Sequence, residues 1–155
     1  MQLDTPGNIL VKPASLQVAG TVGMKNILSG IVVADGQVRI GECEIGVPSE
    51  PAMAIGQRFY LCLPSERIIL IRPEHDPDGQ VENALHGELV DEFSDGMNVT
   101  LFFRAVNARL RPTEPYDLQI DVPVYIYERL ALAHQRTWTV SLRKRSMHLI
   151  PDDAH

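Results

Sequence analysis

A five-residue pattern, Asn-x-Leu-x-Gly, occurs as Asn26-Ile27-Leu28-Ser29-Gly30 and again as Asn83-Ala84-Leu85-His86-Gly87. Each copy leads into a β-like run, Ile31–Val33 in the first case and Glu88–Val90 in the second. Self-similarity within a chain is the sequence signature of a repeat architecture. The pattern therefore predicts two related structural units in tandem.

A second pair of similar segments follows the two boxes in the same order. Ala52–Leu63 parallels Ala131–Leu142, and both copies then end in an apolar run, Ile68–Ile71 and Met147–Ile150. The boxes lie 57 positions apart and the second pair lies 79 positions apart. The later copy therefore contains about 22 additional residues, which we expect around Asn107–Pro123.

Short strands and tight turns dominate the local patterns. Asp-Gly dipeptides in Ala34–Gln37 and Ser94–Met97 predict hairpins. Only Pro13–Ala19 and Pro123–Leu132 are compatible with helices, and both are short. The sequence therefore predicts an all-β fold of tandem OB-like small β-barrels with one or two short helices.

The repeats also predict the organisation of the chain. We assign residues 26–72 to the first OB-like repeat and residues 80–151 to the second, with a polar, proline-broken linker at Arg72–Gly79. A single repeat of this size buries little apolar surface, so the two are expected to pack as one unit. Residues 1–25 precede the repeats.

The composition argues against several classes of function. The 155 residues carry 14 basic and 20 acidic side chains, a net charge of -6, whereas nucleic-acid binding usually requires a basic surface. Neither a membrane span nor a signal peptide is evident. Cys43 and Cys62 lack a CxxC spacing, which favours buried thiols in a reducing cytoplasm over a disulfide or a zinc site.

These motifs resemble the transport-associated OB (TOBE) region of ABC-transporter ATP-binding subunits, which is related to the molybdate-binding Mop domains. In that family an Asn-x-Leu-x-Gly box opens each copy, and an Arg-Pro-Glu triplet, here Arg72-Pro73-Glu74, frequently follows an apolar strand. Residues 1–25 are similar to the end of the ATPase domain and imply a remnant of that domain and its linker. The phosphate-binding motif G-x-x-x-x-G-K-[ST] does not occur, so we expect no ATPase activity from this chain.

The resemblance also suggests an oxyanion site. In the molybdate-binding relatives, Ser-Ala-Arg precedes the Asn box, and a Lys in the closing strand completes the donor set for a tetrahedral oxyanion. Here Lys25 takes the Arg position before Asn26, and the closing-strand position falls on Arg143 in the second copy but on Pro64 in the first. Glu82, before the second box, would repel an anion.

One hypothesis is thus a composite oxyanion site of Lys25, Asn26 and Arg143. The alternative is that both cations are solvated and that the box asparagines cap turns through their side-chain amides. No catalytic residue is assigned, and the histidines lack a metal-ligand spacing, so no metal site is expected. Phe59 and Trp138 occupy equivalent repeat positions, which favours core packing over base stacking.

The sequence therefore predicts a non-catalytic regulatory or accessory domain of an ABC importer's ATPase subunit. Such a domain would contact its own ATPase domain and a second copy of the subunit, and the permease only indirectly. It would lie in the cytoplasm, peripheral on the inner face of the cell membrane, and could sense a small solute or anion. No cofactor is expected in this chain, because ATP and magnesium belong to the missing ATPase domain. The alternatives are a free-standing molybdate- or tungstate-type oxyanion-binding protein and an OB-fold oligonucleotide-binding protein.

Overall fold

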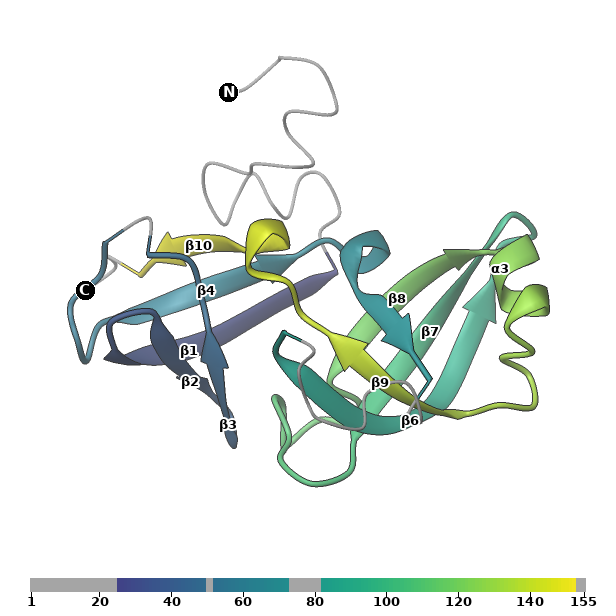
Figure 1. Cartoon of the computed structure of the whole chain (residues 1–155), viewed down its shortest axis with the longest axis horizontal. Helices are drawn as coiled ribbons and strands as arrows, with labels where there is room; N and C mark the ends of the chain where they lie inside the picture. Colours follow the sequence, from purple (N-terminus) through teal and green to yellow (C-terminus); the bar gives the residue numbers. More distant parts are fainter. Residues whose placement is uncertain (1–24, 50–51, 73–81, 153–155) are drawn as a thin grey trace, which may run out of the picture.

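In the part that the structure describes, strands are the dominant secondary structure and the fold is nearly all β, as the sequence predicts (Figure 1). The structure is a computed structural model that describes residues 25–49, 52–72 and 82–152. In chain order, the elements of these ranges are β1 (Asn26–Ala34), β2 (Gln37–Ile40), β3 (Cys43–Gly46), β4 (Arg58–Leu63), the 3-10 helix η1 (Ser65–Arg67), β5 (Ile69–Ile71), β6 (Ala84–Ser94), β7 (Asn98–Ala105), β8 (Leu118–Pro123), α3 (Val124–Arg129), β9 (Thr137–Ser141), the 3-10 helix η3 (Lys144–Ser146) and β10 (His148–Pro151).

The strands form two antiparallel five-stranded sheets with the same internal arrangement. The first sheet has the order β10-β4-β1-β2-β3, and the second has the order β5-β9-β6-β7-β8. Gly30 of the first box pairs with Phe59, and Gly87 of the second box pairs with Trp138. The register therefore makes β1 equivalent to β6 and β4 equivalent to β9, as the sequence alignment of the repeats predicts.

The two repeats exchange their closing strands, a feature that the sequence patterns do not predict. β5 follows β4 along the chain but pairs with β9, whereas β10 follows β9 but pairs with β4. Each sheet is therefore completed by a strand of the other repeat. The buried apolar side chains of both sheets form one continuous cluster, so the repeats share a single core.

The box glycines are required where neighbouring strands approach closely. A Cβ at Gly30 would lie 2.5 Å from the Arg39 carbonyl oxygen and 2.9 Å from the Phe59 ring. A Cβ at Gly87 would lie 2.2 Å from the Arg104 carbonyl oxygen. Any side chain at these positions would push the adjacent strand away and open the curved sheet.

Both predicted hairpins are present. The β6–β7 turn is fixed by Asp95, whose carboxylate accepts hydrogen bonds from the N–H groups of Met97 (2.9 Å) and Asn98 (2.8 Å). Gly36 and Gly96 adopt positive φ angles of 72° and 95°, which a side chain would disfavour. Phe59 and Trp138 are both 1% exposed, which confirms that these aromatics pack in the core.

The largest share of the additional residues of the second repeat lies in the loop at residues 106–117, between β7 and β8. The buried carboxylate of Asp117 holds this loop, since it accepts hydrogen bonds from the N–H groups of Ala105 and Arg111 and from Arg109 Nε. The predicted second helix is observed as α3. The predicted helix at Pro13–Ala19, the proposed ATPase remnant before Lys25, and most of the linker lie outside the described residues. No helix in the described ranges has the length and apolar character that crossing a lipid bilayer requires.

Candidate functional site at the repeat junctions

The first candidate site lies where the first box meets the edge of the second sheet. Asn26 is 2% exposed. Its Nδ2 donates to the carbonyl oxygens of Gln119 (2.8 Å) and Leu63 (3.3 Å), and its Oδ1 accepts from the N–H of Gln119 (2.7 Å). Both amide hydrogens of Asn26 are thus used by backbone carbonyls, so neither is left for a ligand.

The second box repeats this arrangement at the edge of the first sheet. Nδ2 of Asn83 donates to the carbonyl oxygens of Gly46 (2.8 Å) and Leu142 (3.0 Å), and its Oδ1 accepts from the N–H of Gly46 (3.0 Å). Asn83 has a positive φ of 46°, which asparagine tolerates better than most residues. Each box asparagine therefore satisfies the backbone of an edge strand that belongs to the other repeat.

A polar cluster of four side chains adjoins the Asn26 junction. The Asp121 carboxylate accepts hydrogen bonds from Ser65 Oγ (2.5 Å) and Thr100 Oγ1 (2.5 Å) and pairs with Lys25 Nζ (3.0 and 3.1 Å). Lys25 Nζ also contacts Thr100 Oγ1 at 3.2 Å. Two hydroxyl groups and one ammonium thus converge on a single anionic group.

The environment of Asp121 favours its ionised form. Burial opposes ionisation, but the hydrogen bonds from Ser65, Thr100 and Lys25 outweigh it and lower the pKa of the Asp121 carboxyl. The carboxylate is therefore charged at neutral pH and offsets the charge of Lys25. A free oxyanion that approached these donors would meet this fixed negative charge.

The other junction differs in charge at the equivalent positions. Glu82 stands where Lys25 stands in the first repeat, and its carboxylate accepts the backbone N–H of Lys144 at 3.1 Å. Arg143 lies between Leu142, whose carbonyl accepts from Asn83, and Lys144.

The structure brings two of the three sequence-predicted site residues together. Lys25 and Asn26 lie in the first junction, whereas Arg143 lies in the second. Within the described ranges, the Arg143 guanidinium makes no hydrogen bond or ion pair. The composite site remains a prediction, and the amide and ammonium donors that it would use already have partners in the protein.

Sequence reasoning missed Ser65, Thr100 and Asp121. The pairing of Thr100 with Asp121 depends on the register between β7 and β8, which the loop at residues 106–117 separates. Hairpin rules do not fix the register across a loop of this length. The exchange of strands is what places Ser65 beside this pair.

Among the described residues, the other reactive groups offer no alternative centre. The thiols of Cys43 and Cys62 are free and buried, and burial raises the pKa of each to about 11. Phe59 and Trp138 are too buried to serve as stacking platforms for bases. In the part of the chain that the structure describes, no group of three or more His, Cys, Asp or Glu side chains is arranged to hold a metal ion.

The strand order and the two paired Asn boxes define a tandem OB-like protein with a TOBE/Mop-like fold. One solved structure that it resembles is the cytoplasmic molybdate-binding protein ModG, in a crystal form with molybdate bound. The match has a TM-score of 0.65 and covers 83% of this chain and 96% of the ModG chain, at 12% sequence identity. No protein-family model and no curated protein matches the sequence. At this identity the likeness concerns the fold.

Proposed function

We propose that this chain is a non-catalytic regulatory or accessory module of an ABC importer's ATP-binding subunit. The proposal is supported by the two boxes and the Arg-Pro-Glu triplet, which resemble those of the TOBE region. The hydrogen bonds of Asp121 favour this proposal over oxyanion binding, because they occupy the donors that an oxyanion-binding protein would offer to its ligand.

The physical role of such a module would be to provide a rigid contact surface. The exchanged strands and the hydrogen-bonded amides of Asn26 and Asn83 fix the two repeats relative to each other. A rigid tandem barrel can transmit contacts between subunits without a bond-making step. We propose that it contacts its own ATPase domain and a second copy of the subunit.

The test begins with the coding sequence next to this chain, which should encode an ATP-binding domain in frame or in an adjacent gene. ATP hydrolysis by that domain should then be measured with this chain present and absent. A change in the hydrolysis rate or in its response to the importer's solute is the expected result. The absence of any such coding sequence, or an unchanged rate and response, would contradict the proposal.

The second candidate function is oxyanion binding. It is favoured by the fold that the chain shares with ModG, whereas the Asp121 carboxylate already occupies the donors of Lys25, Ser65 and Thr100. Titration calorimetry with molybdate, tungstate and sulfate separates the two functions. Saturable heat with any of the three supports oxyanion binding, and the absence of heat with all three removes it.

A further inference from the structure

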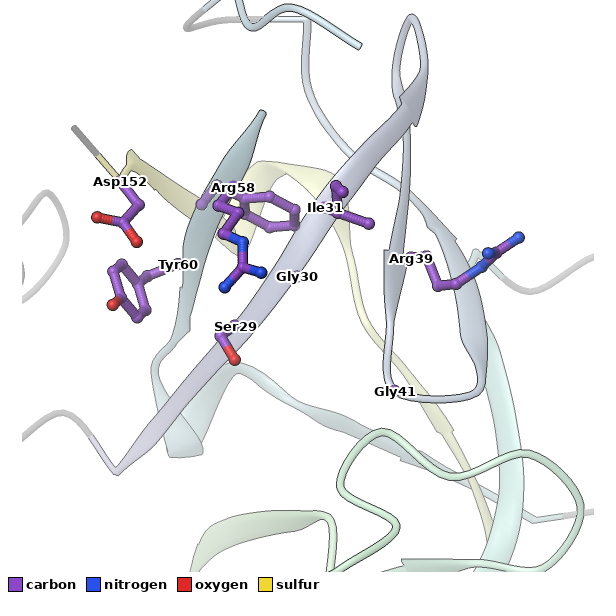
Figure 2. A pocket seen from close by; sticks show the side chains of 9 residues that line it. Ser29, Gly30, Ile31, Arg39, Gly41, Arg58, Tyr60 and Asp152 are labelled. Atoms are coloured by element: carbon purple, nitrogen blue, oxygen red, sulfur yellow. The ribbon is translucent and has the colours of Figure 1, made fainter. Parts of the chain in front are cut away.

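The outer face of the first sheet contains a cavity of about 440 Å³ that no part of the proposed function uses (Figure 2). Volumes of this size are typical of small-molecule sites in proteins. Strand alternation explains which side chains reach it: Leu28 and Leu61 point into the core, so their neighbours on β1 and β4 point outward. The lining residues are Ser29, Gly30, Ile31, Arg39, Gly41, Arg58, Phe59, Tyr60 and Asp152.

Three polar side chains of this face, those of Ser29, Arg58 and Tyr60, have no hydrogen-bond partner among the described residues. In the β1–β4 register Ser29 lies opposite Tyr60, and Ile31 lies opposite Arg58. Figure 2 shows Arg58 and Tyr60 next to each other, with the Arg58 guanidinium directed towards Ser29 and Gly30. Among the residues that the structure describes, neither this guanidinium nor the hydroxyl groups of Ser29 and Tyr60 make a hydrogen bond.

The equivalent face of the second sheet provides an internal comparison. The positions of Ser29, Tyr60 and Ile31 are taken there by His86, Thr139 and Glu88, and that of Arg58 by Thr137. On that face the polar groups satisfy one another. His86 Nδ1 lies 2.7 Å from Thr139 Oγ1, and Glu88 pairs with Arg104 at 3.3 Å. Unpaired donors thus distinguish the first sheet from the second.

The charges around the cavity favour an anion on one side of Arg58. Arg39 pairs with Glu44 at 3.0 Å, whereas Arg58 makes no ion pair within the described residues. Asp152 lines the cavity beside Arg58, whose carbonyl oxygen accepts the Asp152 N–H at 3.0 Å, and it has interactions of its own. Its carboxylate disfavours an anion there, so the anionic group of a ligand is expected on the Ser29 side of Arg58.

A second cavity of about 380 Å³ extends this face into a groove. It shares Ser29 and Gly41 with the first cavity. Its far wall is residues 110–114, part of the loop that is longer in the second repeat. The groove therefore continues along β1, which leaves space for the rest of a ligand beyond its anionic group.

We propose that this groove binds a small organic anion with a phosphate or carboxylate group attached to a flat apolar portion. The Arg58 guanidinium binds the anionic group through its fixed pair of donors. The Ser29 and Tyr60 hydroxyls donate to the same group, and the side chain of Ile31 and the ring of Tyr60 contact the apolar portion. This inference concerns a different surface from the repeat junctions and does not depend on the transporter context.

The proposal is tested by amide NMR titration of the whole chain with phenyl phosphate, benzoate and inorganic phosphate. We expect saturable shifts of residues 29–31 and 58–60 with at least one of the two aromatic anions, and at least about tenfold weaker binding of inorganic phosphate. Comparison of phenyl phosphate with benzoate identifies which anionic group the groove prefers. Equal binding of inorganic phosphate would contradict the role of Ile31 and Tyr60.

The variant Arg58→Thr gives the first sheet the residue that the second sheet has at this position, so it is compatible with a β-strand. It should weaken binding of the aromatic anion at least about tenfold. Arg129→Gln removes the same charge from an exposed position on α3 and should leave affinity within about twofold. Equal losses in both variants, or no saturable shifts in the unsubstituted protein, would overturn the proposal. Thermal unfolding of both variants checks that they remain folded.

Discussion

Replacement of Asn26 by alanine should destabilise both repeats. The side chain is buried, and the substitution removes three hydrogen bonds to backbone atoms of Leu63 and Gln119. The N–H and carbonyl of Gln119 would lose these partners at the edge of β8. A net loss of about 1 kcal/mol for each hydrogen bond gives a destabilisation of about 3 kcal/mol, and each unpaired backbone group that water does not reach adds to this figure.

Urea unfolding, followed separately by far-UV circular dichroism and by fluorescence of Trp138, measures this effect. Trp138 is the only tryptophan in the chain and is buried in the second sheet. Because Asn26 belongs to the first repeat, a shift of the fluorescence transition reports coupling between the repeats. We expect the two signals to shift together, since each sheet contains a strand of the other repeat.

Two further variants separate the amide chemistry from side-chain volume. Asn26→Asp keeps the size but replaces both amide donors with a carboxylate oxygen that faces two carbonyls, so it should destabilise at least as much as alanine. Ser29→Ala, on the outer face of β1, should change stability by less than about 0.5 kcal/mol. A loss below about 0.5 kcal/mol in Asn26→Ala, or a fluorescence transition that does not move with the dichroism, would refute the reasoning.

Further predictions concern individual side chains. Asp121→Ala leaves Lys25 uncompensated, so calorimetry should detect molybdate or sulfate binding near a Kd of about 1 mM, whereas the unsubstituted protein should give no signal. The pKa of the Asp121 carboxyl is lowered in the folded state, so its ionised form stabilises the fold. This stabilisation is fully present above the unfolded pKa of about 3.9 and is lost as pH falls through the folded pKa. In urea unfolding, the stability difference between the unsubstituted protein and Asp121→Asn should therefore shrink below about pH 4. Gly87→Ala places a Cβ against the carbonyl of Arg104 and should cost at least about 2 kcal/mol in urea unfolding. The Cys62 thiol, with its pKa raised to about 11 by burial, should react with an aromatic disulfide reagent at pH 8 only as fast as the protein unfolds.

The parts of the fold that follow from local sequence could be predicted. The boxes at Asn26 and Asn83 identify equivalent strands because each box packs against its own neighbouring strand, and Asp95 identifies its hairpin because the turn is made by adjacent residues. The partner of β5 could not be predicted in this way. Its sequence suits either sheet, and the choice between β4 and β9 depends on the packing of the whole molecule.

In the candidate site, too, only the features that depend on local sequence could be predicted. Lys25 was identified by its place before the box, but Asp121 was not, because it reaches Lys25 only through the pairing of β8 with β7 and the position of that edge beside Asn26. A charged residue in a sequence gives no indication of which opposite charge it will meet across 96 positions of chain. Only the structure therefore shows that Asp121 neutralises the charge of Lys25, and this pairing is the observation that most affects the functional conclusion.

Covalent fusion of the repeats explains how the two junctions differ although their backbone arrangement is the same. In a symmetric assembly of identical single repeats, one sequence position would supply both junctions, so a change of charge would occur twice. In this chain the two positions are encoded separately, and one holds Lys25 whereas the other holds Glu82. The box asparagines remain in both junctions because each must satisfy an edge strand, whereas the neighbouring charges are not fixed by that requirement. The same separation allows the first sheet to carry Arg58 and Tyr60 on its outer face while the second sheet carries threonines at the equivalent positions.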